Sequence, residues 1–247
     1  MAGGGRVVLR PIWADLHIHT VLSPCAEVEM IPPLIVRRAR ELGLGLLAIT
    51  DHNSAENVAA VQRAAQNSGI VVLAGMEVQT REEAHILCLY DTVEQALDWQ
   101  ALVYASLPPL VNREDVFGAQ FVVDETGDFI CQNERLLLTS TTLTVEDVVA
   151  GVRARGGVPI AAHVDRPSYS LLASLGFIPP DLALGALEVR NLPLPLQVRG
   201  WPTIVSGDAH RLSEMRANML VTMEQPSIRE LELALRGEEG RKVKTMP

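Results

Sequence analysis

Aromatic residues make up only 4% of the 247-residue chain, although 48% of its residues are hydrophobic. The core must therefore consist of Val, Leu, Ile and Ala, a composition typical of parallel sheets that are buried on both faces. The chain contains no run of about 18 uncharged apolar residues, so no membrane span is expected. The N-terminal segment MAGGGRVVLRPIWADL also lacks the apolar stretch of a signal peptide.

Cysteines and basic side chains are also scarce. Cys25, Cys88 and Cys131 are odd in number and show no CxxC spacing, which indicates a reducing compartment, so we expect a soluble cytoplasmic protein. The 21 basic and 30 acidic side chains give a net charge of −9. Proteins that bind long nucleic acid through its phosphates usually carry a basic stripe, so this balance weakly disfavours such a partner. A small phosphorylated substrate remains compatible, because bound metal ions supply local positive charge.

Apolar, strand-like runs alternate with helical segments through most of the chain. Strands are expected at about 7–18, 46–50, 70–73, 85–90, 158–162, 186–189 and 203–206. Helices are expected at about 32–42, 55–67, 92–107, 145–154, 168–175 and 227–235. This alternation is typical of a parallel α/β sheet or barrel. The last residues, 241–247, are expected to be frayed.

Residues 91–142 interrupt this alternation. An acidic, glycine-containing turn at 124–128 separates two short apolar runs, which predicts a hairpin. The irregular part, 110–142, is short for an independent core. We therefore expect a single domain over residues 1–247, with an insertion at about 91–142 that covers one face.

Histidines gather at the ends of the predicted strands. His17 and His19 are two residues apart at the end of the first apolar run, so their side chains point to the same face. All six histidines lie at or near an end of such a run, and three carboxylates do the same. The full set is His17, His19, Asp51, His52, Glu77, His85, His163, Asp208 and His210. The carboxyl ends of barrel strands open on one face, so these distant residues are expected to converge.

This set of ligands predicts a metal cluster. Imidazole and carboxylate groups in such number suit Zn, Mn or Fe better than Mg or Ca, and they exceed the needs of one ion. We expect two or three divalent ions, with Glu77 as the bridging carboxylate. Cys25 could complete a third site as a thiolate, or it could be a bystander in its loop. Asp15 and Asp51 are expected to orient the ligands rather than bind metal.

Five motifs in this order carry a family resemblance: DLHIHT (15–20), AITDHNS (48–54), GMEV (75–78), AHV (162–164) and SGDAH (206–210). Together they resemble the PHP (polymerase and histidinol phosphatase) family. The resemblance implies a distorted (β/α)7 TIM-like barrel, a di- or trinuclear metal site at the C-terminal face of the strands, and phosphoester hydrolysis. Because no polymerase segment accompanies the motifs, the chain looks like a stand-alone member.

The resemblance also implies which residue binds which ion. One ion is held by His17, His19, Glu77 and Asp208, and a second by Glu77, His85 and His163. A third is held by His52 and His210, where many trinuclear members carry a histidine in place of Cys25.

The leading hypothesis is a histidinol-phosphatase-like hydrolase that acts on a small phosphomonoester. Glu77, Asp208 and His163 are the expected catalytic residues. A hydroxide formed from metal-activated water there would attack the phosphorus. Arg166 and Arg211 are expected to bind the substrate phosphate, although each could be a solvated surface arginine. The alternatives are a nuclease or phosphodiesterase acting on nucleotides or short oligonucleotides, a carbon–nitrogen hydrolase, and a non-catalytic metal-binding regulatory module. The sequence specifies neither the native metals nor the oligomeric state.

Overall fold

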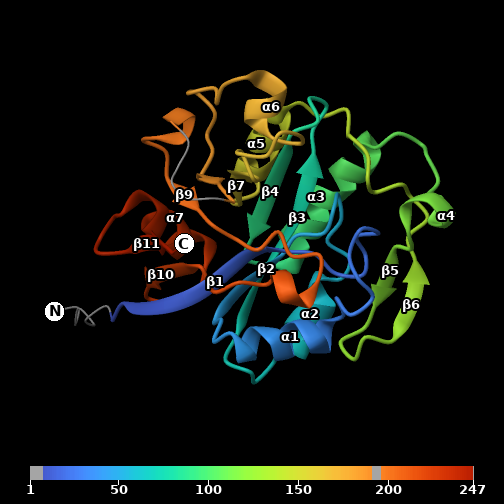
Figure 1. The fold of residues 1–247 in the computed structure, drawn as a ribbon, viewed down its shortest axis with the longest axis horizontal. Helices are drawn as coiled ribbons and strands as arrows, with labels where there is room; N and C mark the ends of the chain where they lie inside the picture. Colours follow the sequence, from blue (N-terminus) through green and yellow to red (C-terminus); the bar gives the residue numbers. More distant parts are fainter. Residues whose placement is uncertain (1–7, 191–195, 247) are drawn as a thin grey trace.

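The computed structural model describes residues 8–190 and 196–246, and it places one nine-stranded mixed sheet at the centre of the chain (Figure 1). The spatial order of the strands is β11-β10-β1-β2-β3-β4-β7-β8-β9. Their bounds are β1 Arg10–Ile18, β2 Leu46–Ile49, β3 Val71–Gln79, β4 His85–Tyr90, β7 Val158–Ala161, β8 Ala186–Glu188, β9 Thr203–Ile204, β10 Met219–Met223 and β11 Lys242–Thr245. The expected first strand began at residue 7, which lies outside the described residues.

The sheet curls into a nearly closed barrel. The pairs β1–β2, β2–β3, β7–β8 and β8–β9 are parallel. After β9 the chain forms a parallel bridge from Ala209 to Ile18 at the end of β1, so the last barrel strand meets the first. The barrel strands are thus β1, β2, β3, β4, β7, β8 and β9, as expected for a distorted TIM-like barrel.

The distortion is centred on β4, which runs antiparallel to both β3 and β7. Residues 80–84 alone connect β3 to β4, and a parallel pair would need a crossover of a dozen or more residues. The expected third strand ended at Leu73, whereas β3 continues to Gln79. Gly75 permits this continuation, because a Cβ there would lie 3.0 Å from the carbonyl oxygen of Cys88 on β4.

Helices cover the outside of the barrel. The larger ones are α1 Pro32–Glu41, α2 Val58–Ala64, α3 Val93–Ser106, α5 Val145–Ala154, α6 Leu171–Leu175 and α7 Ile228–Arg236. Capping boxes begin α3 at Thr92 and α5 at Thr144, each satisfying free backbone N–H groups of the first turn. The 3₁₀ helices are η1 Leu196–Val198 and η2 Leu212–Glu214. Within the described residues, no helix has both the length and the apolar character needed to cross a membrane.

The C-terminal region departs from the sequence-based expectation, which missed β10 and took residues 241–247 as frayed. Instead β11 pairs antiparallel with β10, which pairs with β1. The guanidinium of Arg241 is buried and donates hydrogen bonds of 3.0 and 2.8 Å to Glu230 of α7. This buried ion pair stabilises a segment whose composition alone indicates a loose tail. Pro247 lies outside the described residues.

Residues 91–142 contain α3, the short helix α4 Glu114–Phe117, and a hairpin of β5 Phe121–Val123 and β6 Phe129–Gln132. The hairpin lies on the side of the molecule away from β10 and β11 (Figure 1). The amide of Asn57 anchors it, donating to the carbonyl of Phe121 and accepting from the N–H of Val123. We propose that this segment is an insertion in a single barrel domain and covers one face of the barrel mouth.

Candidate metal centre

All six histidines meet at one end of the barrel strands, as the sequence predicts. Their rings form a closed circuit in which neighbouring centroids are 4.5–5.8 Å apart, with His210 stacked 4.0 Å from His19. The contacts run His17–His19, His19–His52, His52–His85, His85–His163 and His163–His17. All except His210 are buried.

Backbone pairing positions these side chains. β1 ends at Ile18, and the hydrogen bonds His19 N–H to Ala209 O and Ala209 N–H to His17 O bring the end of β1 beside the SGDAH segment. Beyond β2, a parallel bridge places His52 next to Glu77. His163 and Asp208 have φ angles of 27° and 48°, which are uncommon for residues other than glycine. Such strain is concentrated at functional sites in proteins.

Glu77 lies at the centre of the cluster. Its Oε1 is 2.8 Å from Nδ1 of His85 and 3.0 Å from Nε2 of His163. Its Oε2 is 2.9 Å from Nδ1 of His52. Nε2 atoms of His17 and His19 are 3.4 and 3.6 Å from the same carboxylate. One buried carboxylate thus faces five imidazoles, the arrangement expected of a bridging ligand.

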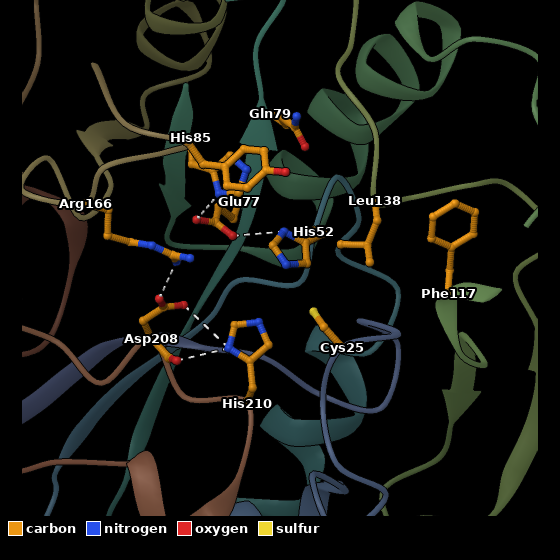
Figure 2. A pocket seen from close by; sticks show the side chains of 11 residues that line it. Cys25, His52, Glu77, Gln79, His85, Phe117, Leu138, Arg166, Asp208 and His210 are labelled. Atoms are coloured by element: carbon orange, nitrogen blue, oxygen red, sulfur yellow. Dashed lines mark hydrogen bonds and ion pairs between the residues drawn. The ribbon is translucent and has the colours of Figure 1, made fainter. Parts of the chain in front are cut away.

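Asp208 provides a second carboxylate. Its Oδ1 is 3.4 Å from Nε2 of His17 and 3.6 Å from Nε2 of His19, whose Nε2 atoms are themselves 3.1 Å apart. Its Oδ2 accepts a hydrogen bond of 3.1 Å from Arg166, which links the cluster to the pocket above it (Figure 2).

Asp15 and Asp51 lie beneath the cluster and hold the backbone of its loops. Asp15 accepts from the N–H groups of Gly207 and Arg216, each at 2.9 Å. Asp51 accepts from the hydroxyls of Thr20 and Ser23, each at 2.7 Å, and Ser23 in turn contacts Nδ1 of His19. This geometry supports the orienting role predicted for both aspartates.

Glu188 belongs to the site, although sequence reasoning did not select it. Its carboxylate is 2.9 Å from Nδ1 of His17 and accepts a 2.9 Å hydrogen bond from the backbone N–H of His163. This contact leaves Nε2 of His17 free to face Glu77 and Asp208. An acidic residue inside the otherwise apolar strand β8 was the available signal.

Opposite charges control protonation in the cluster. Burial alone would raise the pKa of Glu77, but His85, His17 and His52 hold it well below its ordinary value. Burial lowers the pKa of His17. The charges of Glu188 and Glu77 outweigh this effect and raise the pKa to well above its ordinary value. Despite burial, the pKa of His52 rises to about 10, chiefly because of Glu77. A cation bound at these histidines would therefore displace protons from them.

The residues present fit a metal cluster. Three overlapping triads have ligand atoms within 4.8 Å of one another. They are His17, His19 and Glu77; His52, Glu77 and His85; and His19, His52 and His210. Nε2 of His85 is buried without a hydrogen-bond partner. Unsatisfied buried acceptors are costly in a protein interior, and coordination to a cation would satisfy them.

Cys25 lies at the mouth of the cluster, beside His52 and His210 (Figure 2). Partial burial raises the pKa of its thiol, but hydrogen bonds from His210 and His52 outweigh this effect and lower the pKa to about 6. The thiolate is the metal-binding form, so the residue has the right chemistry for a ligand. Ligation by Cys25 stays a prediction.

The two arginines expected to bind phosphate differ in position. Arg166 lines the pocket above the cluster. Arg211 is half exposed and pairs with Glu27 and Glu214 at 3.6 and 3.2 Å, and it is not among the residues that line this pocket. Only Arg166 is therefore placed to meet a phosphate next to the cluster.

The pocket has a volume of about 360 Å³. Besides the cluster residues, Cys25 and Arg166, its walls include four side chains that sequence reasoning did not select. They are Gln79, Phe117, Leu138 and Tyr169. Phe117 and Leu138 come from the predicted insertion, and no sequence motif marks either of them.

A polar cluster of this kind at the strand ends of a barrel is typical of metal-dependent hydrolases. The PHP domain model matches residues 15–141, slightly more than half of the chain, so the chain belongs to the PHP domain family. This membership confirms the resemblance that the motifs predicted, and it supports the expected class, hydrolases that act on phosphoric ester bonds. His163, Asp208 and His210 lie beyond the matched segment, and the fold brings them to it.

Curated relatives include the 5′-3′ exoribonuclease Rnm of Salmonella typhimurium and of Escherichia coli. The chain is 36% identical to each over 73 residues, which is 29% of this chain and 24% of the relative. The match thus spans about a quarter of the length of these relatives.

Solved structures share the fold. The endonuclease Q of Pyrococcus furiosus has a TM-score of 0.71 and 18% identity. An endonuclease Q complex with a 27-mer duplex that carries an abasic lesion has a TM-score of 0.70 and 16% identity. These matches cover 95% and 94% of this chain and 58% of each neighbour. A structure described as a metal-dependent phosphoesterase from Bifidobacterium adolescentis has a TM-score of 0.54 and 20% identity, covering 80% of this chain and 87% of the neighbour.

These relatives contradict the expectation that long nucleic acid is not a partner. One group is named as an exoribonuclease, and another is bound to a DNA duplex at its active site. The net charge is a poor guide to nucleic-acid binding because it sums over the whole surface, whereas phosphate binding depends on groups at the pocket. Arg166 and cations held by the cluster would supply positive charge there even in an acidic protein.

Proposed function

We propose that this protein is a metal-dependent nuclease that hydrolyses phosphodiester bonds in nucleic acid or oligonucleotides. The observation that carries the proposal is a cluster of six histidines, five of them buried around Glu77, which opens into a pocket beside Arg166. The named activities of the relatives favour this alternative over a small phosphomonoester substrate.

Two or three divalent ions are proposed to occupy the cluster. His17, His19, Glu77 and Asp208 would hold the first, and Glu77, His85 and His163 the second. His52 and His210, with Cys25, would hold the third. Bound there, such ions would lower the pKa of water toward about 7 and neutralise phosphate charge. Zn, Mn and Fe all suit these donors.

The residues of the chain have separate tasks in this proposal. Glu188 keeps Nδ1 of His17 occupied, so that its Nε2 faces the cluster. Arg166, which pairs with Asp208 in the structure, would turn to a phosphate oxygen with a charge-assisted hydrogen bond. The side chain of Arg166 is 30% exposed, so it can reach substrate without unfolding its surroundings.

A non-catalytic regulatory module would not require the full set of ligands at one pocket. The nearly complete cluster therefore favours an enzyme. A phosphomonoesterase would use the same cluster, so only substrate specificity separates it from a nuclease.

The test is a substrate panel. Protein loaded with Mn, Zn or Fe is assayed against phosphomonoesters, mononucleotides, single-stranded RNA and DNA oligonucleotides, and duplexes. The proposal predicts cleavage of an internal or terminal phosphodiester that stops when a chelator removes the metal. Release of inorganic phosphate from monoesters without any cleavage of diesters would refute it.

A further inference from the structure

The pocket above the cluster has two chemically different halves. Figure 2 shows Arg166, Asp208 and His210 on one side and Leu138 and Phe117 on the other. The charged half suits a phosphate next to metal ions. The apolar half is not needed for phosphoester chemistry, so it indicates that the substrate carries an apolar group beside its phosphate.

Phe117 is held in place although its side chain is 39% exposed. It ends α4 and is followed by Gly118, whose φ is 96°. A Cβ at residue 118 would collide with the carbonyl of Pro24, the residue before Cys25, so the insertion packs directly on the Cys25 loop. Asn112 also donates a 2.8 Å hydrogen bond to the carbonyl of Gly118.

Leu138 is fixed from the other side by Asn53. The buried amide of Asn53 donates to the carbonyls of Leu137 and Thr139, at 2.8 and 2.9 Å. These two hydrogen bonds fix the backbone on both sides of Leu138. Asn53 directly follows His52, so the same loop presents a cluster histidine and positions the apolar wall.

A third wall residue, Tyr169, is 43% exposed and stacks on His85 with a centroid distance of 5.1 Å. Its backbone carbonyl accepts a hydrogen bond from the N–H of His85, and its φ is 56°. Two solvent-accessible aromatic rings therefore line a pocket that also contains the proposed metal centre.

We infer that Phe117, Leu138 and Tyr169 form a base-binding subsite, in which the unpaired nucleobase next to the scissile phosphate stacks on an aromatic ring. The inference rests on the proposed function and specifies its substrate as an unpaired nucleotide unit. A volume of about 360 Å³ is at the lower end of small-molecule sites, which suits one nucleotide unit inside the pocket. Stacking on aromatic side chains tolerates any base, so the subsite would recognise base presence rather than base identity.

The test compares Phe117→Ala with wild type on two short single-stranded substrates. One carries every base, and the other has an abasic tetrahydrofuran unit beside the scissile phosphate. Phe117→Ala should lower kcat/KM on the first by about 5- to 100-fold, the range measured for base–aromatic stacking. On the abasic substrate the kcat/KM values of the two proteins should agree within about twofold, because this substrate lacks the base that would stack on Phe117. Phe117→Trp should restore activity on the first substrate.

Phe177→Ala is the matched control, because Phe177 is an exposed phenylalanine that is not among the pocket residues. Equal losses by Phe117→Ala on both substrates, or no loss on either, would overturn the inference.

A binding measurement separates this inference from the proposed function. Calorimetry compares a nucleoside monophosphate with ribose 5-phosphate on wild type and Phe117→Ala. The base should tighten binding at least about fivefold in wild type, and this gain should disappear in the variant. Equal affinities in wild type refute the subsite. If wild type cleaves no phosphodiester, the proposed function fails, and the binding comparison alone decides the subsite.

Discussion

Glu77→Gln removes the charge at the centre of the cluster while keeping the size and shape of the side chain. Glu77 faces ligands of two of the three triads, with contacts of 2.8–3.0 Å to His85, His163 and His52. Loss of a group that only supports a metal ligand costs about 10- to 100-fold in metal affinity, so loss of a shared ligand should cost at least about 100-fold in each triad. Turnover should accordingly fall below about 1% of wild type.

Metal content of the purified variant, measured by elemental analysis, and its turnover on a single-stranded oligonucleotide test this expectation. Glu230→Gln is the matched control, because Glu230 is a buried glutamate that pairs with Arg241 away from the pocket. The control should lose thermal stability but keep its metal, whereas Glu77→Gln should lose metal and keep its fold. Near-normal turnover or metal content in Glu77→Gln would refute the central role assigned to this carboxylate.

Five further predictions follow from the same geometry. Arg166→Ala should raise KM by about 10- to 100-fold, because charged hydrogen bonds contribute about 1.5–3 kcal/mol, whereas Arg211→Ala should change KM less than about twofold; equal effects would reject the assignment of the phosphate to Arg166. Glu188→Gln should weaken metal binding about 10- to 100-fold by freeing Nδ1 of His17, and an unaltered metal affinity in calorimetry would oppose this role. Cys25→Ser should lower occupancy of the third ion and Cys25→His should shift preference toward Mn; wild-type metal content in both variants would show that the thiol is a bystander. Because the pKa of Cys25 is lowered to about 6, its thiolate persists above that pH and third-ion occupancy should fall as the pH drops through about 6. Because the pKa of His52 is raised to about 10, metal binding at pH 7 should release at least about one proton per chain, and calorimetry in buffers of different ionisation enthalpy that detects none would contradict this.

Strand-end position was sufficient to predict the cluster. Parallel strands of a barrel open on one face, so His17, His52 and His210 could be placed together without any structure. Glu77, which is predicted to bridge two ions, has imidazoles on both of its oxygens. Local sequence succeeded here because most of these residues end or closely follow an apolar strand with a fixed direction.

Features that depend on contacts between distant segments were not predictable. The direction of β4 is set by its short connection to β3, and the buried pair of Arg241 and Glu230 orders β11. Glu188 acquires its role only because β8 lies beside the cluster, and Phe117 reaches the pocket only through packing on the Cys25 loop. Apart from the acidic residue in an apolar strand that marks Glu188, none of these contacts has a local signature in the sequence.

The central claim is that the metal-loaded cluster cleaves phosphodiesters in nucleic acid. The most direct measurement is the ratio of kcat/KM for an end-labelled single-stranded oligonucleotide to that for the corresponding nucleoside monophosphate, with the same metal-loaded protein. We expect a ratio well above one and loss of oligonucleotide cleavage on chelation or in Glu77→Gln. Phosphate release from the monophosphate with an intact oligonucleotide would contradict it.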